Sequence, residues 1–386
     1  MKFRTNRVLA GLAVAAGLAL TAVAGSQPAR AADGLPSKIS MGALLPLTGN
    51  AGFIGEEIRQ GLEYYLADYA KMRAAAGLPE LNVAFVDSQA DPRIGFQGYQ
   101  LLRSKYDAQL VLTTYTSVGI AIGPQANKDN IPVVNVTQGE VTKVGPNFTS
   151  ILPAYSVQAE IVVKEAMSRG AKTFSVLYEN SEAFVVQAKA LQDDVCPRLG
   201  CKIVASAQLP TGATDIAAQV TAALAPNPDV VFPIGIAPQL VPIARELQTR
   251  GYKGQVIGLS DLGGVVTTGN GQLINGAHLV NFAFDEDNAD YKRLTQMFRE
   301  KYKKEPTQYV YMGYQAGQVI VETLKLMKAK NTPWSGPNFV AAQKSGALPT
   351  ISGPVRFLPD GRIDEQMMLM VVKDGKMVPE KKVGLH

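Results

Sequence analysis

The sequence predicts an α/β protein with two lobes, each built on a doubly wound parallel β-sheet that is covered by helices on both faces. First, short β-prone apolar runs alternate with amphipathic stretches of helix length, which is the pattern of βαβ units. Second, this alternation stops near residue 150 and then restarts. Third, about 355 residues remain after an N-terminal leader, more than one hydrophobic core usually supports.

The N-terminus is predicted to be a secretory signal peptide covering residues 1–31. Its first seven residues carry three basic side chains and no acid, and residues 8–25 are uncharged and rich in Ala, Leu and Val. Ala29-Arg30-Ala31 fits the small-x-small rule for cleavage, after Ala31 or Ala32. The short apolar run and the cleavage site argue against the alternative, a membrane anchor. We therefore expect export, to the periplasm in a Gram-negative cell.

Charge and cysteine content narrow the class of protein. Removing the leader's four basic residues from the 38 in the sequence leaves 34 against 33 acids, a net charge of +1. This balance, without a basic stripe carrying aromatics, argues against a nucleic-acid partner. Cys196 and Cys201 are expected to form a disulfide in an oxidising compartment. Their spacing is not that of a redox or zinc pair.

The first series of elements follows the order strand, helix, strand. Apolar runs predict strands over 39–45, 81–86, 110–112 and 132–136. The stretches between them predict helices over 56–76, 92–106 and 119–128. Asp91-Pro92 supplies an N-cap followed by proline at the first helical position, so the start of the second helix is well marked.

The second series repeats this order and ends in a tail of different character. Helices are expected over 157–168, 182–199, 214–225 (with Thr214 as N-cap) and 238–250, and strands over 173–178, 202–208, 230–232 and 255–258. Two helices, 288–302 and 309–330, follow the stretch 277–284. In the tail, Asp360-Gly361 and Asp374-Gly375 predict turns between short strands.

Catalytic signatures are missing, so we predict neither an enzyme nor a metal or cofactor site. The sequence has two histidines, His278 and His386, which disfavours a His-dependent triad or a His-rich metal site. "GLSDLG" at Gly258 lacks the second glycine of G-x-S-x-G, and the chain has no P-loop motif. Paired acids could still hydrolyse a substrate, but nothing singles out a pair.

Five consecutive hydroxyl residues, Thr113 to Ser117, follow a predicted strand. In open α/β sheets, ligands bind beyond the carboxyl ends of the strands. A helix that begins near Gly119 would direct free N–H groups and its positive dipole end at the same point. Hydroxyls and a helix N-terminus can hold a carboxylate without a basic side chain. One of the five hydroxyls could instead cap the helix.

Other predicted strands also end in polar or small residues. Thr137 and Gln138 follow one strand, and Ser260 and Asp261 follow another in the second series. Residues 178–184 and 234–236 occupy two further strand ends. The strand ends of the two lobes can converge on one site only if the lobes face each other across a cleft. For Asp261, a turn or N-cap role is an equally simple reading.

Three segments carry a resemblance to a known family: "ISMGALLPLTGNAGFIGEEIRQGLEYYLADY", "VAFVDSQADPRIGFQGYQLL" and "LPTGATDIAAQVTAA". They resemble the periplasmic solute-binding proteins of branched-chain-amino-acid-type (Leu/Ile/Val-binding) ABC transporters, over roughly residues 39–373. The resemblance implies a type I periplasmic-binding fold, in which three crossover hinge segments, near 151–155, 280–284 and 363–367, join the lobes. Lobe I would comprise 37–152 with 283–363, and lobe II 153–282 with 364–386. The lobes would close on the ligand by hinge motion.

The resemblance also implies roles for individual residues. Thr116 or Ser117 matches the hydroxyl that holds the ligand carboxylate, and Val136, Thr137 and Gln138 match the small residues after the fourth strand. Asp261, or Ser260 with a one-residue gap, matches the acid that pairs with an α-amine.

The side pocket departs from the family pattern. Two positions that carry tyrosine in the leucine/isoleucine/valine binders match Ile54 and Ile236. The nearby residues that could line an apolar or aromatic pocket are Phe53, Tyr115, Ala183 and Phe184. The family's first-lobe disulfide is absent, and Cys196–Cys201 lies elsewhere.

These observations predict a monomeric binding protein that delivers a small carboxylate-bearing solute to an inner-membrane ABC permease. Two ligand classes fit equally at this point. An aliphatic or aromatic amino acid would use Asp261 for its ammonium group. An aromatic or other organic acid would need only the hydroxyl cluster and apolar surroundings. A third interpretation, from another class of function, is a ligand-sensing receptor domain with a separate membrane partner.

Overall fold

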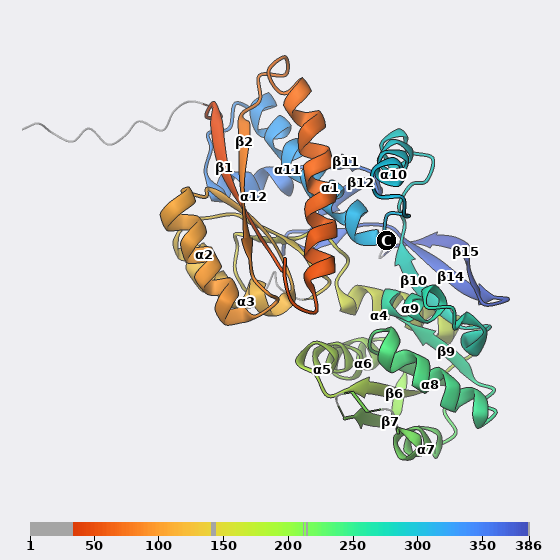
Figure 1. Ribbon diagram of the computed structural model, residues 1–386. Helices are drawn as coiled ribbons and strands as arrows, with labels where there is room; N and C mark the ends of the chain where they lie inside the picture. The colour runs from red at the N-terminus through yellow and green to blue at the C-terminus, as the bar shows by residue number, and fades with distance from the viewer. Residues whose placement is uncertain (1–33, 140–143, 211, 214, 385–386) are drawn as a thin grey trace, which may run out of the picture.

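The computed structural model describes residues 34–384 except 140–143, 211 and 214 (Figure 1). The predicted leader and the predicted N-cap at Thr214 lie outside these residues. The described chain forms two lobes around two mainly parallel sheets, which confirms the predicted α/β class. Lobe I carries the five-stranded sheet, and lobe II carries the seven-stranded sheet.

The lobe I sheet is parallel throughout, in the order β2-β1-β3-β4-β5. The strands are β1 (Lys38–Leu45), β2 (Glu80–Asp87), β3 (Leu110–Thr114), β4 (Val133–Val136) and β5 (Phe148–Ser150). All residues of β3 and β4 are buried, as expected for a parallel sheet that helices cover on both faces. A small antiparallel sheet of β11 (Leu348–Thr350), β12 (Gly353–Phe357) and β13 (Ile363–Asp364) completes this lobe.

The lobe II sheet has the order β15-β14-β10-β9-β8-β6-β7. Its parallel part comprises β6 (Thr173–Glu179), β7 (Lys202–Leu209), β8 (Val230–Ile234), β9 (Gln255–Gly258) and β10 (His278–Phe282). The tail adds an antiparallel hairpin, β14 (Met367–Lys373) and β15 (Lys376–Val383). Asp374 and Gly375 both have positive φ in its turn, which confirms the predicted Asp-Gly turn.

Helices cover both sheets. Lobe I carries α1 (Gly52–Met72), α2 (Pro92–Tyr106), α3 (Thr116–Lys128), α10 (Ala289–Tyr302), α11 (Gln308–Ala329) and α12 (Gly336–Gln343). Lobe II carries α4 (Tyr155–Ser168), α5 (Glu182–Lys189), α6 (Cys196–Leu199), α7 (Ala217–Leu224), α8 (Ala237–Thr249), α9 (Gly263–Thr267), the π-helical turn η2 (Ala190–Val195) and the 3-10 turns η3 (Ser260–Leu262) and η4 (Gly271–Ile274). As predicted, Asp91 caps α2 by accepting from the N–H groups of Arg93 and Ile94.

Helices α1 and α11 lie side by side in lobe I (Figure 1). Two glycines allow this close approach. A Cβ on Gly61 would lie 1.9 Å from the carbonyl oxygen of Val310, and one on Gly313 would lie 2.0 Å from that of Ile58. The contact places the N-terminal turn of α11 beside the first turns of α1.

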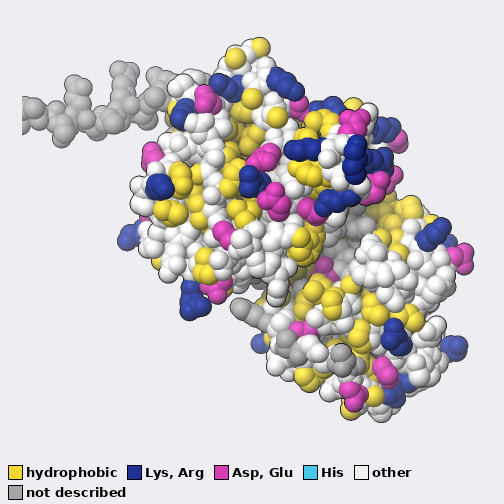
Figure 2. Space-filling model, viewed as in Figure 1, with side chains coloured by type: hydrophobic (Ala, Val, Ile, Leu, Met, Phe, Trp, Pro, Cys, Tyr) yellow, Lys and Arg dark blue, Asp and Glu magenta, His cyan; other side chains and the backbone are white. Residues whose placement is uncertain are grey.

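The chain passes between the lobes three times: after β5, after β10, and between β13 and β14. Figure 2 shows the surface hollowed between the two lobes. We propose that lobe I comprises residues 37–152 with 283–363 and lobe II residues 153–282 with 364–386.

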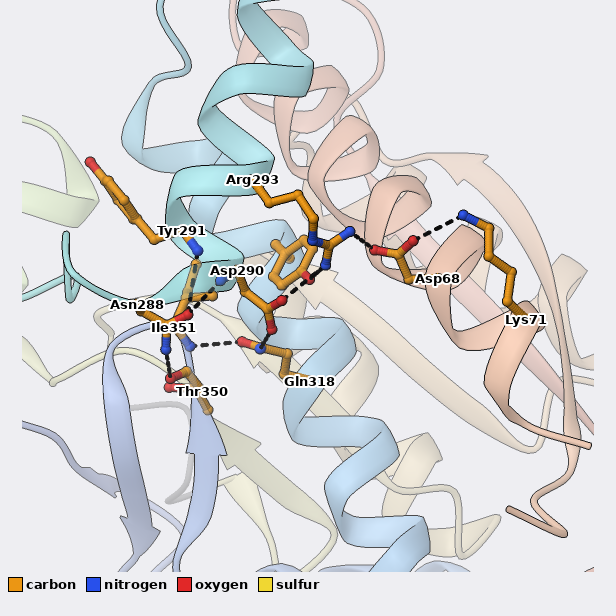
Figure 3. Close-up of polar contacts among 10 residues, drawn as sticks. Asp68, Lys71, Asn288, Asp290, Tyr291, Arg293, Gln318, Thr350 and Ile351 are labelled. Atoms are coloured by element: carbon orange, nitrogen blue, oxygen red, sulfur yellow. Dashed lines mark hydrogen bonds and ion pairs between the residues drawn. The ribbon is translucent and has the colours of Figure 1, made fainter. Parts of the chain in front are cut away.

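After the second passage, a polar network attaches α10 to lobe I (Figure 3). Arg293 of α10 forms ion pairs with Asp290 and with Asp68 of α1. Gln318 of α11 donates to Asp290 and accepts from the N–H of Ile351. The network therefore ties α10 to α1, α11 and the end of β11.

Several boundaries differ from the predictions. Helix α3 begins at Thr116 rather than Gly119, and α1 begins at Gly52 rather than Glu56. The helix predicted over 182–199 contains the π-helical turn η2, and the helix predicted from 214 begins at Ala217. Strands β5 and β11 were missed because each has three residues, too few to show a period. Helix α12 was also missed, although Ser335 caps it by accepting from the N–H of Asn338.

Candidate functional site

Two of the five consecutive hydroxyls stabilise the lobe I sheet. Thr113 Oγ1 donates to the carbonyl oxygen of Leu44 at 2.9 Å, and Thr114 Oγ1 donates to that of Val136 at 2.6 Å. Both threonines are buried. Their hydroxyls are therefore committed to neighbouring strands and are not available to a ligand.

The chain turns sharply at Tyr115 before α3 begins. Tyr115 has φ 70° and ψ 128°, a positive φ that is costly for a residue with a side chain. The N–H groups of Thr116, Ser117 and Val118 occupy the first turn of α3, where a helix supplies no acceptors. Within the described part of the chain, none of the three donates to a backbone carbonyl. This turn therefore offers free donors and the positive end of the α3 dipole.

Thr116 and Thr137 come together at this edge of the sheet. Their Oγ1 atoms share a hydrogen bond of 3.1 Å, and Thr137 Oγ1 also accepts from the N–H of Gly139 at 3.3 Å. A Cβ on Gly139 would lie 2.0 Å from Thr116 Oγ1, so the loop after β4 packs directly on the start of α3. The structure thus brings Thr116, Ser117 and Thr137 to one place, as the sequence predicts.

Asp261 lies in lobe II, in the turn η3 that follows β9. Burial raises the pKa of its carboxyl to about 6. Among the residues that the structure describes, no side chain forms an ion pair with this carboxyl. An acidic group with restricted access to water and no cationic partner is available for a cationic ligand group.

Two tyrosines from different lobes, Tyr155 and Tyr309, lie near Asp261, and Tyr115 lies near both of them. Burial raises the pKa of Tyr155 and of Tyr309, that of Tyr309 to about 12, and the nearby charge of Asp261 is the second cause in both cases. The charge of Tyr115, whose own pKa burial raises, also acts on both. Tyr115 and Tyr309 belong to lobe I, and Tyr155 opens α4 in lobe II. Asp261 therefore faces the gap between the lobes.

The predicted apolar residues lie in different surroundings. Phe53 is 59% exposed and stacks edge to face on Tyr309, with ring centroids 6.0 Å apart. Ile236 is 49% exposed at the start of α8. Ile54 and Phe184 are half-buried and pack against the main hydrophobic core, and Ala183 is exposed. Phe53 therefore shares the aromatic surface of Tyr309, and the other residues remain predictions.

Gln138, predicted to contact the ligand, is already engaged with lobe II. Its Oε1 accepts from Gln158 Nε2 at 2.5 Å and from Ser260 Oγ at 3.2 Å. The N–H of Ser260 in turn donates to Gln158 Oε1 at 3.2 Å. Since Ser260 is bonded in this way, the structure favours Asp261 over Ser260 as the group free to meet an amine.

Sequence reasoning missed Tyr155, Tyr309 and Gln158. Tyr155 and Gln158 lie at the first passage between the lobes, and Tyr309 lies far along the chain at the start of α11. No local pattern connects them with the hydroxyl cluster. The nearest available signal was the position of Tyr155 in a predicted crossover segment.

Other features lie outside this site. Cys196 and Cys201 form a disulfide between α6 and the segment before β7, with Cα atoms 4.8 Å apart. A hollow of about 780 Å³ on lobe I is lined by residues of α10 and α11, including Tyr291 and Arg299, and is separate from Asp261. In the described ranges, no group of three or more His, Cys, Asp or Glu side chains could hold a metal, and no helix is suited to span a membrane.

The model of the periplasmic binding protein family matches residues 38–376. The chain belongs to this family. The match confirms the resemblance on which the two-lobed fold was predicted, and it places the chain among binding proteins rather than enzymes.

Three similar proteins illustrate the range of the comparisons. The chain is 26% identical over 332 residues to the chemotactic signal transduction system substrate-binding protein BasB of Halobacterium salinarum, covering 82% of this chain and 75% of BasB. Its fold resembles a leucine-binding protein LivK from Thermotoga maritima (18% identity, TM-score 0.73, 90% of this chain and 99% of LivK). It also resembles an ABC transporter solute-binding protein from R. palustris in complex with benzoate (19% identity, TM-score 0.72, covering 89% of this chain and 96% of that protein).

Proposed function

We propose that this protein is the solute-binding component of an ABC importer and captures an amino acid with an aliphatic or aromatic side chain. The ligand carboxylate would bind at the first turn of α3, beside Thr116, Ser117 and Thr137. The ammonium group would bind Asp261. The protein would act in the periplasm after removal of its leader and deliver the solute to an inner-membrane permease.

The observation that carries this proposal is the Asp261 carboxyl, which lies between tyrosines of both lobes and has no cationic partner among the described residues. An ammonium group would supply that partner, and an unpaired buried charge would otherwise cost stability. The free donors of α3 supply the complementary site for a carboxylate. A ligand with both groups would therefore satisfy both lobes.

A second candidate ligand is an aromatic acid without an amine. The R. palustris protein in complex with benzoate has a similar fold, and Phe53 and Tyr309 offer aromatic surface here. Such a ligand would use the donors at α3 and leave Asp261 unpaired. It would then bind better when Asp261 is protonated, below pH 6, because a neutral carboxyl does not repel the acid.

One experiment separates the two ligands. Calorimetric titration at pH 7.5 would test L-leucine, L-phenylalanine, benzoate and 4-hydroxybenzoate against the wild type and Asp261→Asn. The proposal predicts that an amino acid binds and that Asp261→Asn weakens it at least tenfold, because a charge-assisted bond contributes about 1.5–3 kcal/mol. Binding of the benzoates alone, unchanged or improved in Asp261→Asn, would establish the second candidate.

A third function has its own support. BasB is named as part of a chemotactic signal transduction system, which supports a signalling partner as the alternative to a permease. Affinity purification of the full chain from membranes of its own host, in the presence of ligand, would distinguish the partners. Recovery of an ABC permease would support the import function. Recovery of a signal transducer without a permease would support the signalling function instead.

A further inference from the structure

The strongest unexplained feature is a buried amide that connects the two halves of the proposed site. Gln158 lies in the first turns of α4, directly after the first passage between the lobes, and is completely buried. Its Nε2 donates to Gln138 Oε1 of lobe I at 2.5 Å and to the carbonyl oxygen of Pro153 at 3.0 Å. Its Oε1 accepts from the N–H of Ser260 in lobe II at 3.2 Å. Both amide hydrogens and the oxygen are therefore used.

Two partners of Gln158, Gln138 and Ser260, are chain neighbours of proposed ligand contacts. Gln138 follows Thr137, whose hydroxyl bonds Thr116 at the carboxylate end of the site. Ser260 precedes Asp261 at the amine end. Two further bonds close the network: Ser260 Oγ donates to Gln138 Oε1 at 3.2 Å, and the N–H of Tyr155 donates to the carbonyl oxygen of Gln138 at 2.8 Å.

We infer that Gln158 is a positioning residue that fixes the separation between the carboxylate end and the amine end of the site, and thereby selects α-amino acids over β-amino acids. The inference rests on the proposed function. A β-amino acid has one more backbone carbon between its carboxylate and its ammonium group. A site whose two ends are held by one saturated, buried amide cannot lengthen without breaking a hydrogen bond in a region that excludes water.

The chemistry of the network predicts how substitutions act. Gln158→Leu has nearly the same volume and removes the bonds to both Gln138 and Ser260, so that of the side-chain bonds described here only the one from Ser260 Oγ to Gln138 Oε1 still joins the two loops. Gln158→Glu keeps an acceptor for the N–H of Ser260 but places a carboxylate oxygen against Gln138 Oε1, which is also an acceptor. Both variants should therefore loosen the spacing, and neither removes a group that touches the ligand.

The test is the ratio of dissociation constants for L-β-homoleucine and L-leucine, measured by calorimetric titration on the full mature chain. L-Phenylalanine and L-β-homophenylalanine form a second pair. The wild type should prefer the α-amino acid, and Gln158→Leu should lower this preference about tenfold, the equivalent of one buried hydrogen bond. Gln192→Leu is the control, since the side chain of Gln192 donates to the carbonyl oxygen of Ala188 within lobe II and should leave the ratio unchanged.

A double-substitution cycle keeps the test valid if Gln158→Leu is merely destabilising. Gln138→Leu should lower the ratio by a similar factor, and Gln138→Leu with Gln158→Leu should change it by less than the sum of the single effects, because both remove the bond between Gln138 and Gln158. Fully additive effects, or an unchanged ratio in folded Gln158→Leu and Gln158→Glu, would overturn the inference while leaving the proposed function intact. Failure of the wild type to bind any of the four amino acids would overturn both.

Discussion

Asp261→Asn gives the sharpest test of the site, because the same carboxyl that would bind a ligand should destabilise the unliganded protein. Its pKa is raised from an ordinary 3.8 to about 6 by burial. The folded state binds this proton more tightly than the unfolded state does. The resulting stabilisation is complete below pH 3.8 and is lost as the pH rises through 6. The difference of about two pKa units corresponds to roughly 3 kcal/mol above pH 6, an upper value because Asp261 retains some exposure.

Asparagine resembles the protonated acid, so Asp261→Asn should remove this loss. Without ligand, the variant should match the wild type near pH 4 and exceed it at pH 8. If both lobes unfold together, about 350 residues give an unfolding entropy near 0.7 kcal/mol per kelvin, so 3 kcal/mol raises Tm by about 4 °C. Saturating amino acid should reverse the order at pH 8, since it stabilises the wild type more.

The assay is calorimetric melting from pH 4 to 8, with and without L-leucine and L-phenylalanine. Asp229→Asn is the control, because the pKa of Asp229 is shifted in the opposite direction: the backbone N–H groups of Lys172 and Thr173 lower it. That variant should lose stability at neutral pH, and the loss should shrink as the pH falls. A variant at Asp261 that is no more stable than the wild type at pH 8, or a gain that does not depend on pH, would refute the reasoning.

Three further predictions concern the fold. Glu365→Gln should raise Tm above pH 7 and leave it unchanged near pH 4 in a melting series, because burial raises the pKa of Glu365 to about 7; a pH-independent effect would contradict this. Gly313→Ala should lower the free energy of unfolding, measured in urea, by about 2 kcal/mol or more, since the new Cβ would overlap the carbonyl group of Ile58. Gly346→Ala is the control, because a Cβ there would meet open space and should change the free energy of unfolding little. Equal effects would refute the close packing of α1 and α11. Replacing Cys196 and Cys201 with serine should cost about 2 kcal/mol in the same assay, because the closed loop is short, and a much larger loss would show that the disulfide holds more than its own loop.

The sequence was sufficient for the fold and for placing the hydroxyl cluster at a strand end. Alternating apolar runs predicted the long strands and helices, and Asp91-Pro92 marked the start of α2 correctly. The hydroxyl cluster was placed at a strand end because chain order in a parallel sheet determines where strands finish. Short elements such as β5 gave no periodic signal, and the start of α3 was placed three residues late because Thr116 and Ser117 are weak helix formers.

The rest of the site depends on which side chains meet in three dimensions. Sequence could not show that Thr113 and Thr114 bond to neighbouring strands, or that Gln138 is engaged by Gln158. It also could not show that Tyr155 and Tyr309, more than 150 positions apart in the chain, share the surroundings of Asp261. Such pairings arise from the passage of the chain between the lobes, which leaves no local pattern.

On the proposed function, the division of the site between the lobes explains how binding could drive closure. The carboxylate end belongs to lobe I and Asp261 belongs to lobe II. A solute with one charged group gains most of its contacts from one lobe, so it favours the open and closed forms almost equally. A solute with both groups gains its second set of contacts only when the lobes approach, and only this differential affinity shifts the equilibrium. Gln158 bonds Gln138 and Ser260 beside the first passage between the lobes, so closure would occur as a rotation about this joined region, which keeps the spacing of an α-amino acid.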